Sequence, residues 1–417
     1  MVSRPGLHRW DLALTIDVEQ FITGILSPKA RDRPLYHLSS LARFVILYAV
    51  LYSAFGVISP FLPAYLGDRG LSPQQIALVI GLGTAVRLAS GPLVGRLADR
   101  QRIWRGTLSI CAAGAGVAAL AYVSARGFGA ILLVSLIQSA LLAPLAPIAD
   151  AITLSASLST LGNGFEYGWV RGGGSAAFIV GSITAGQAAA SLGLAVSIWL
   201  NALLLALAAL AAVPVPNISV EAVSFGSERA RGFLLLLRMR AFRRLLLVGA
   251  LVLGSHALHD TFAVIRWRDA GISTATASLL WSESVIAEVV VFLLIGPSLL
   301  RRLGPANAAM VAASAGVVRW SVLGATTQIV PLMLVEPLHG LTFALLHLAS
   351  MRLIGTMVPH HLAATAQALY GTVAVGISTA LLTVVSGSLY ASLAGEAFWM
   401  MAILCAGAIP LARTMTS

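Results

Sequence analysis

Charged residues are scarce in this sequence of 417 residues: they make up 10% of the chain, whereas hydrophobic residues make up 58%. A soluble domain usually carries charge on roughly a quarter of its residues, so this composition excludes an ordinary soluble domain. Apolar stretches of about 20 residues recur after residue 40, and each is long enough to cross a bilayer as a helix. The sequence therefore predicts an all-α, multi-pass membrane protein.

Cysteine is almost absent as well. Cys111 and Cys405 both lie within apolar stretches, where cysteine acts as a small packing residue, so we expect neither a disulfide nor a cysteine metal site. The sequence also lacks the HExxH, GxSxG and GxGD signatures and a Walker loop. These absences argue against an enzyme, a bound metal and a cofactor.

Twelve apolar spans can be placed along the chain. A helix needs about 20 residues to cross the hydrocarbon core, and the segment before residue 41 has no such run and no signal peptide pattern. We interpret that segment as a cytoplasmic tail. The spans fall near residues 42–66, 74–98, 105–125, 128–154, 167–190, 193–213, 242–265, 274–298, 305–325, 328–351, 363–391 and 396–412.

The net charge of +11 has two explanations, nucleic acid binding and membrane topology. Cytoplasmic loops of membrane proteins are enriched in arginine and lysine, and the arginines here gather in alternate loops. We therefore expect no nucleic acid partner, a location in the cell inner membrane and both termini in the cytoplasm. The arginines concerned are Arg100, Arg102, Arg105, Arg229, Arg231, Arg238, Arg240, Arg243, Arg244, Arg301 and Arg302.

The two halves of the chain repeat each other. Gly-Leu-Ser at residues 70–72 returns as Gly-Ile-Ser at 271–273, and with the same offset Arg87 falls on Glu288. Such a duplication predicts twelve transmembrane helices in two pseudo-symmetric six-helix bundles. The expected division is a tail at 1–40, bundles at 41–213 and 242–417, and a cytoplasmic linker at 214–241.

A signature lies between spans two and three. Gly95-Arg-Leu-Ala-Asp99-Arg100, followed by Arg105, resembles the Major Facilitator Superfamily signature, although Arg102 stands where a glycine is usual. The resemblance implies two bundles that rock about a midplane site, with a gate at Gly95, Asp99 and Arg100. Gly95 would permit close helix approach, and Asp99 would form and release a charge pair. A solvated helix end is the alternative for Asp99.

A more specific likeness covers spans seven, eight and ten. Residues 255–257 (Ser-His-Ala), 280–281 (Leu-Trp), 287–288 (Ala-Glu) and 336–343 (Glu-Pro-Leu-His-Gly-Leu-Thr-Phe), with the entry to span five at 167–175, resemble the phenylpropionic acid transporter branch, which is related to lactose and nucleoside proton symporters. This implies proton-coupled symport of a small organic solute, favouring an aromatic or other monocarboxylate. Sugar or nucleoside symport and drug efflux are the alternatives. A membrane-embedded enzyme and a sensor without transport are the other classes.

Ionisable side chains within the spans each cost at least ~2.5 kcal/mol, so each needs a partner, a water-filled cavity or a function. Arg87 and Glu288 occupy equivalent depths in spans two and eight, which suggests complementary charges around one cavity, or else a static ion pair. An arginine can hold a carboxylate through two hydrogen bonds. Arg87, Arg171 and Arg319 are therefore candidates for binding an anionic substrate, and pairing with Asp150, Glu288 or Glu336 is the alternative.

Span ten carries candidates for proton coupling. Glu336, His339, Phe343 and His347 are spaced three, four and four residues apart, which places them on one helical stripe. A buried carboxyl without a permanent cation partner readily holds a proton, and an imidazole titrates near neutrality. Glu336 is the first choice and Glu288 the second, with a structural hydrogen-bond network as the alternative. The further candidates are His339, His347, Asp150, His256 and Asp260.

Span seven places His256, His259 and Asp260 on one face, which a metal site or a carrier cavity could explain. The carrier cavity needs fewer assumptions. Trp281 and Phe343 would suit stacking on a ring-bearing substrate, although membrane aromatics also serve as packing groups. We expect a monomer whose partners are a small-molecule substrate, protons and the lipid bilayer.

Overall fold

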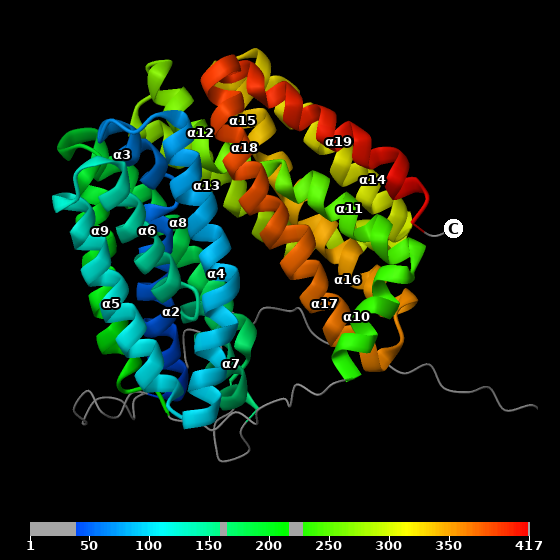
Figure 1. Ribbon diagram of the computed structural model, residues 1–417, viewed down its shortest axis with the longest axis horizontal. Coiled ribbons are helices and arrows are strands. Elements are labelled where there is room, and N and C mark those ends of the chain that lie inside the picture. The colour runs from blue at the N-terminus through cyan, green and yellow to red at the C-terminus, as the bar shows by residue number, and fades with distance from the viewer. Residues whose placement is uncertain (1–38, 159–164, 217–227, 416–417) are drawn as a thin grey trace, which may run out of the picture.

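The computed structural model describes residues 39–158, 165–216 and 228–415, and within these ranges every regular element is helical. The tail expected at 1–40 lies almost wholly outside the described residues, as does much of the linker expected at 214–241. Figure 1 shows the helices arranged as two bundles, one from each half of the chain.

The first half forms six membrane crossings. Two of them are interrupted near a proline, because proline cannot donate the backbone hydrogen bond that continues a helix. The crossings are α2 (Ser40–Ile58) with α3 (Leu62–Asp68), α4 (Pro73–Gln101), α5 (Trp104–Ser124), α6 (Gly127–Leu142) with α7 (Leu145–Ser157), α8 (Tyr167–Leu192) and α9 (Ala195–Ala212).

The second half is less regular, since three of its crossings contain π-helical turns. After the linker helix α10 (Glu228–Arg238), its elements are α11 (Arg240–Gly254) with α12 (His256–Asp269), α13 (Thr274–Val290), η3 (Val291–Ile295), α14 (Gly296–Ala325), α15 (Ile329–Val335), η4 (Glu336–Leu338), η5 (Gly340–Leu345), α16 (Leu346–Met357), η6 (His360–Leu362), α17 (Ala363–Leu369), η7 (Tyr370–Ile377), α18 (Ser378–Leu393), η8 (Ala394–Glu396) and α19 (Ala397–Arg413).

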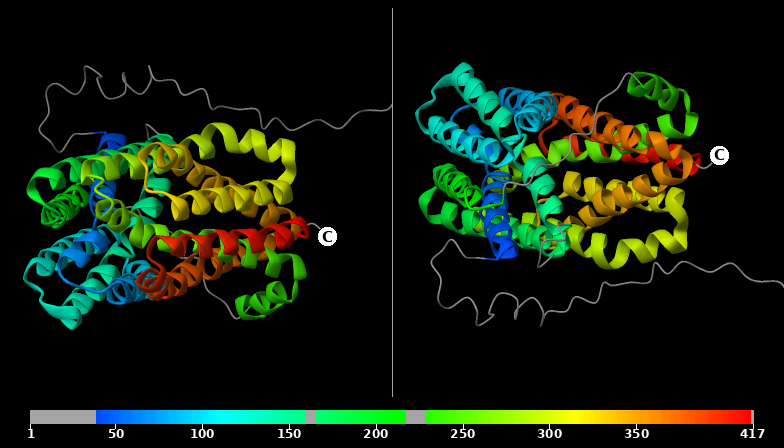
Figure 2. Two further views of the ribbon diagram at one scale, coloured as in Figure 1. Left: turned by 90° about the horizontal axis from the view of Figure 1, so that it is seen from above. Right: turned by 90° about the horizontal axis from the view of Figure 1, so that it is seen from below.

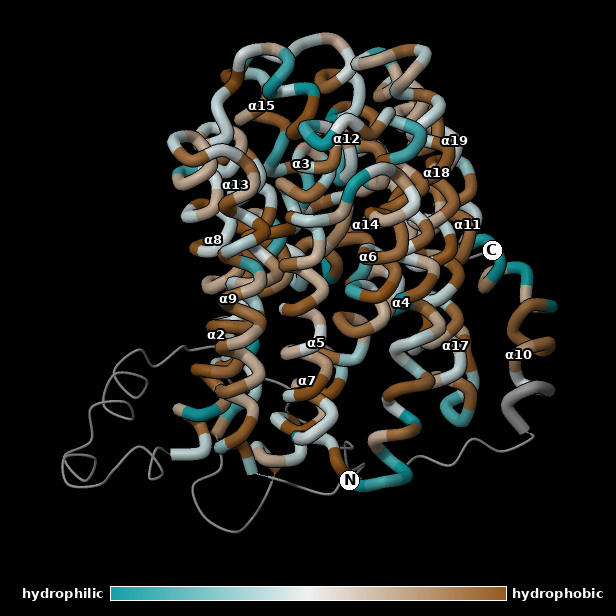
Figure 3. Tube along the Cα trace, turned by 60° about the vertical axis from the view of Figure 1, so that its left-hand side comes forward, coloured by the Kyte–Doolittle hydropathy of each residue, from teal (hydrophilic) through white to brown (hydrophobic). Residues whose placement is uncertain are grey.

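The predicted count of twelve crossings is confirmed. The described residues contain 10 long apolar helical segments, and two of these, Thr274–Ala325 and His360–Arg413, are double-length. Each turns back once: the first at Gly304, whose φ is 74°, and the second at Ala394, whose φ is 47°. Ten segments thus make twelve crossings. In Figure 3 hydrophobic residues recur along the length of these helices, as a lipid environment requires.

The sequence repeat is also a repeat of backbone geometry. Gly70 and Gly271 adopt φ angles of 83° and 85°, in the left-handed region that glycine enters without strain. Two residues later, Ser72 and Ser273 each cap the next helix by accepting a hydrogen bond from the backbone N–H three residues on. The same local chemistry therefore starts the second crossing of each half.

The two bundles meet at the end of the molecule that carries α3 and α12 and diverge toward the end that carries α7, α10 and α17 (Figure 1). A salt bridge joins them at the closed end, where Arg268 contacts Asp68 at 3.0 and 3.3 Å. Glycines let the helices approach there. Gly186 on α8 has no room for a side chain beside Ser278 on α13, and a Cβ at Gly81 on α4 would lie 2.6 Å from Val384 on α18. The molecule is thus closed opposite the linker and spread on the linker side.

The expected close helix approach at Gly95 is wrong for this conformation, because nothing lies within 4 Å of the position its Cβ would take. This glycine sits on the part of α4 that diverges from the other bundle. Asp99, one turn further, makes no side-chain hydrogen bond or ion pair with another described residue. Its role in gating stays a prediction, and it concerns a conformation in which the linker side is closed.

Arg102 ends α4 with φ 53° and ψ 33°, where the sequence departs from the usual glycine. A side chain in this left-handed conformation costs about 1 kcal/mol. We therefore predict that Arg102→Gly raises the free energy of unfolding by about that amount. Chemical unfolding in detergent micelles measures it. Arg100→Gly, which places glycine in regular helix, should lower stability instead, and a loss of stability in Arg102→Gly would contradict the prediction.

Candidate transport site

Glu336 and His339 reach the bundle interior from an irregular stretch of span ten. Pro337 follows Glu336 directly and cannot donate the next helical hydrogen bond, so the chain passes through the 3-10 turn η4 and the π-helical segment η5. Gly340 then lets this stretch approach α13, since a Cβ there would lie 2.5 Å from the Ala287 carbonyl oxygen. The local break thus sets the polar side chains of span ten against spans eight and nine.

An ion pair between Arg319 and Glu336 forms the centre of the site. The guanidinium Nη2 lies 2.6 Å from Glu336 Oε2, and both side chains are 0% exposed. Ser284 donates to the same carboxylate oxygen at 2.5 Å, and His259 Nε2 lies 3.2 Å from the other oxygen. The arginine also lies over the Trp320 ring at 4.6 Å. Every oxygen of the carboxylate therefore has a partner, which a buried charge requires.

This geometry corrects one expectation. We expected Glu336 to lack a permanent cation partner, and that premise is wrong because Arg319 supplies one. The pairing alternative considered for Arg319 is the arrangement observed. An ionised carboxylate held by a guanidinium at 2.6 Å gives up its charge with difficulty. The proton-coupling role of Glu336 stays a prediction, and it would require the pair to separate in another conformation.

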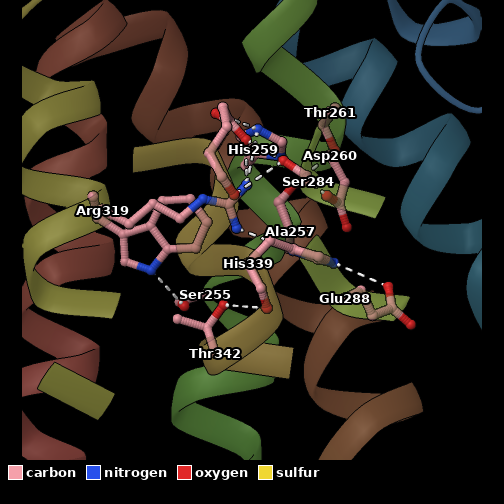
Figure 4. A network of polar contacts seen from close by, with 12 residues as sticks. Ser255, Ala257, His259, Asp260, Thr261, Ser284, Glu288, Arg319, His339 and Thr342 are labelled. Atoms are coloured by element: carbon pink, nitrogen blue, oxygen red, sulfur yellow. Dashed lines mark hydrogen bonds and ion pairs between the residues drawn. The ribbon is translucent and has the colours of Figure 1, made fainter. Parts of the chain in front are cut away.

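His339 connects this centre to Glu288. Its Nδ1 lies 3.1 Å from Arg319 Nη1, and its Nε2 lies 3.3 Å from Glu288 Oε2 (Figure 4). A guanidinium can only donate, so Nδ1 accepts and the ring proton resides on Nε2, which donates to Glu288. While the arginine contact holds, Nδ1 of His339 is occupied as an acceptor, and the ring connects Arg319 to Glu288 through its two nitrogens.

The network is buried at its centre and accessible at both ends. His259 places its other ring nitrogen, Nδ1, 3.3 Å from Asp260 Oδ1. The side chains of Asp260 and Glu288 are 50% and 27% exposed, whereas those of Arg319 and Glu336 are fully buried. The predicted acids Glu288, Glu336 and Asp260 thus belong to one chain of contacts, and the two exposed acids lie at its ends.

Aromatic rings stack on the two histidines of this network. Trp281 is parallel to His259 at 5.3 Å between centroids, and Phe343 is parallel to His339 at 5.5 Å. In this conformation both predicted stacking residues therefore have protein partners, and their contact with substrate stays a prediction. His256 lies against His339 at 5.0 Å, and its buried Nε2 has no hydrogen-bond partner among the described residues.

His347 lies further along span ten, outside the hydrogen-bonded network. Its ring packs near Phe292 and Tyr370, at centroid distances of 5.8 and 6.2 Å. Sequence reasoning missed Ser284, although it stands four residues before Glu288 and so shares its helical face. Across the described residues, no group of three His, Cys, Asp or Glu side chains is arranged to hold a metal ion.

The first half contributes a separate group of charges. Asp150 accepts hydrogen bonds from the hydroxyls of Tyr48 at 2.5 Å and Tyr167 at 3.0 Å. Arg171 is exposed, and its guanidinium lies over the Tyr52 ring at 4.7 Å. Neither charged group has an ion-pair partner within the described part of the chain. Asp150 is thus held by neutral hydroxyls and Arg171 by an aromatic ring.

Arg87, from the middle of α4, is exposed and makes no hydrogen bond or ion pair with another described residue. The next residue, Leu88, packs against Gly376 on η7 of the second bundle. This contact places Arg87 near the interface between the bundles. The static ion pair considered as the alternative for Arg87 and Glu288 is absent from the described contacts, since Glu288 pairs with His339. An unpaired cation therefore lies close to the surface where the bundles meet.

Two six-helix bundles that enclose buried and accessible charges define a membrane transporter, not an enzyme. The family model for the MFS_1 like family matches residues 41–401. The chain therefore belongs to that family within the Major Facilitator transporters.

Relatives and solved structures agree with this assignment. The chain is 32% identical over 360 residues to the probable 3-phenylpropionic acid transporter of Escherichia coli, a match that covers 86% of this chain and 93% of the relative. It is 25% identical over 348 residues to the maltose permease of Geobacillus stearothermophilus, covering 83% and 86%. The fold matches the crystal structure of the nucleoside transporter NupG with a TM-score of 0.79, 17% identity and coverage of 91% and 98%.

The buried ion pair generates a stability prediction. Glu336→Gln leaves the Arg319 charge buried without its counter-ion, which costs about 3–5 kcal/mol. The double variant Glu336→Leu with Arg319→Met removes both charges and should recover most of that loss. Thermal unfolding of purified variants in detergent tests this ordering. Equal stability of Glu336→Gln and the parent chain would show that the pair does not hold span ten to span nine.

Proposed function

We propose that this protein couples proton movement to the transport of a small organic anion, with an aromatic monocarboxylate as the favoured substrate. The observation that carries the proposal is an unequal distribution of charge. The second half holds Asp260, Glu288 and Glu336 around a single arginine, whereas the first half presents the unpaired Arg87 and Arg171. The acids of the second half are suited to carrying a proton, and the arginines of the first half are suited to binding an anion.

Arg87 is the preferred residue for the substrate carboxylate. A guanidinium binds a carboxylate through two parallel hydrogen bonds, and this one has no competing partner among the described residues. Arg319 is already paired with Glu336, and the guanidinium of Arg171 lies over the ring of Tyr52. The relative named for 3-phenylpropionic acid supports a substrate that joins an aromatic ring to a carboxylate. Trp281 and Phe343 would contact the ring after leaving their histidine partners.

Glu288 is the preferred proton carrier. It is accessible, and its partner His339 donates a neutral hydrogen bond that leaves the other carboxylate oxygen free to take a proton. Both carboxylate oxygens of Glu336, in contrast, already have partners while the ion pair with Arg319 is intact. The second acidic end of the network, Asp260, is the next candidate because it too is accessible.

The coupling follows from the cost of burying charge. When the linker side closes, Arg87 and Glu288 lose water, and an isolated charge in the membrane interior is unfavourable by several kcal/mol. A bound carboxylate neutralises Arg87, and a bound proton neutralises Glu288. In the empty carrier, Arg87 and Glu288 are opposite in sign and would compensate each other on closure. Closure with only one of the two ligands leaves an unpaired charge, so substrate and proton move together.

The same reasoning supports an orientation in the inner membrane. The linker side carries most of the loop arginines, which in such proteins face the cytoplasm. Both termini would then be cytoplasmic, and the conformation described here would open inward. A monomer suffices for this mechanism, because both bundles come from one chain.

Counterflow in proteoliposomes tests the substrate class. Aromatic monocarboxylates should exchange across the membrane, and an imposed proton gradient should drive their accumulation. Sugars and nucleosides should do neither. Accumulation of a neutral sugar, with no response to aromatic acids, would overturn the assignment to organic anions.

Glu288→Gln tests coupling. The amide mimics the protonated acid and cannot release a proton, so gradient-driven accumulation should fall at least tenfold while substrate exchange persists. Glu396→Gln removes an exposed acid of the same half and should leave both activities unchanged. Gradient-driven accumulation that survives in Glu288→Gln would remove this residue from the coupling role.

Arg87→Gln tests recognition of the anion. Loss of a bidentate contact should weaken carboxylate binding by roughly tenfold to a hundredfold, since a charge-assisted hydrogen bond contributes about 1.5–3 kcal/mol. Arg105→Gln, at the linker-side start of α5, serves as the matched control. Binding can be followed by tryptophan fluorescence in detergent. Unchanged affinity in a folded Arg87→Gln would transfer the role to Arg171, which the corresponding Arg171→Gln measurement would show.

A further inference from the structure

The linker helix α10 lies outside both bundles, along the flank of the second one (Figure 2). Its described side chains begin at Gly232, which packs against Leu362 at the start of span eleven. Leu236, one turn later, is completely buried. These contacts fix α10 to the second bundle, so that it moves with that half of the transporter.

The outer face of α10 is apolar. Phe233, Leu234 and Leu235 are 41%, 59% and 50% exposed, three large hydrophobic side chains in a row on a helix that does not cross the membrane. Water is an unfavourable surrounding for such a patch, so it needs a cover. The second bundle cannot cover this apolar face, because it contacts the opposite face of α10 through Gly232 and Leu236.

Exposed arginines border this apolar face. Arg238 stands one turn after Leu234 on the same side of α10, and Arg240 and Arg243 follow in the first turn of α11. Only Met239 separates the linker helix from this membrane-crossing helix, so the patch lies within about two helical turns of its start. Arginine can keep its guanidinium among polar headgroups while its stem lies along apolar surface.

We propose that α10 lies in the linker-side surface of the bilayer, with Phe233, Leu234 and Leu235 inserted among acyl chains and Arg238, Arg240 and Arg243 bound to anionic phospholipid headgroups. Amphipathic helices bind membranes by this combination of apolar area and positive charge. A membrane is the occupant because the patch is continuous with a transmembrane helix and lies where lipid is already present. Between Gly232 and Arg238, where the side chains of α10 are described, the helix has no acidic residue to oppose the arginines.

The anchor has a mechanical consequence. Because α10 is packed on the second bundle, lipid binding holds that bundle against the leaflet, and the first bundle moves relative to it. Anionic lipid would then affect the rate of interconversion without touching the substrate. This proposal is independent of the transported solute and of proton coupling.

A fluorescent probe on α10 tests the proposal. Leu235→Cys can be labelled selectively in the full-length chain with an environment-sensitive dye, since the native Cys111 and Cys405 are buried. The labelled protein is reconstituted in vesicles of phosphatidylcholine, with or without phosphatidylglycerol, and quenching by lipids with brominated acyl chains is measured. Quenching should be strong when phosphatidylglycerol is present. Each of Arg238→Gln, Arg240→Gln and Arg243→Gln should reduce the ratio of lipid-bound to lipid-free α10 about fivefold.

Removal of two arginines elsewhere on the same side provides the control. Arg301→Gln with Arg302→Gln changes charge at exposed positions of α14 and should leave quenching of the α10 probe unchanged. Quenching that ignores both phosphatidylglycerol and the three α10 arginines would overturn the proposal. So would a probe that is shielded from water yet not quenched by lipid, because that result would mean that protein or a second copy covers α10. Neither readout depends on transport activity.

Discussion

The ion pair between Arg319 and Glu336 is the interaction on which the second bundle depends. Two full charges without solvent exposure are tolerated in a membrane only when each has partners, and here Ser284, His259 and His339 provide them. The pair ties span nine to span ten, and through the histidines it reaches spans seven and eight. Four crossings are thereby held around one charged centre. The position of this arginine also fixes the tautomer of His339, whose Nε2 then donates a hydrogen bond to Glu288.

The two halves share a backbone plan but have diverged in chemistry. The glycine and serine that start the second crossing are repeated with nearly identical geometry, which preserves the fold. At equivalent depths, however, the first half has the unpaired Arg87 and the second has Glu288 within a network. A duplicated bundle can keep its helix-packing residues and alter the groups that face the other bundle, because those groups contribute little to the stability of either bundle alone. Under the proposed mechanism, this difference in charge would give the first half the substrate anion and the second half the proton.

Closure at the end opposite the linker uses contacts that are easily broken. Glycines on α4 and α8 allow close approach to α18 and α13, and a single exposed salt bridge joins Asp68 to Arg268. Exposed ion pairs contribute little free energy, and small-residue contacts separate without leaving large apolar side chains without partners. The charged centre, in contrast, lies wholly within the second bundle. The contacts that close this end of the molecule are thus separate from the charged centre.

The sequence by itself determined the membrane class, the twelve crossings and the duplication, because apolar length and helical spacing are local properties. Spacing also placed Glu336 and His339 together on span ten. It could not reveal that Arg319, seventeen residues earlier on another crossing, would pair with Glu336, nor that Asp150 would be held by Tyr48 and Tyr167. Nor could it show that α4 diverges at Gly95. Only the tertiary structure decided these points, because partner choice depends on how helices distant in the chain are packed and on which conformation the two bundles adopt.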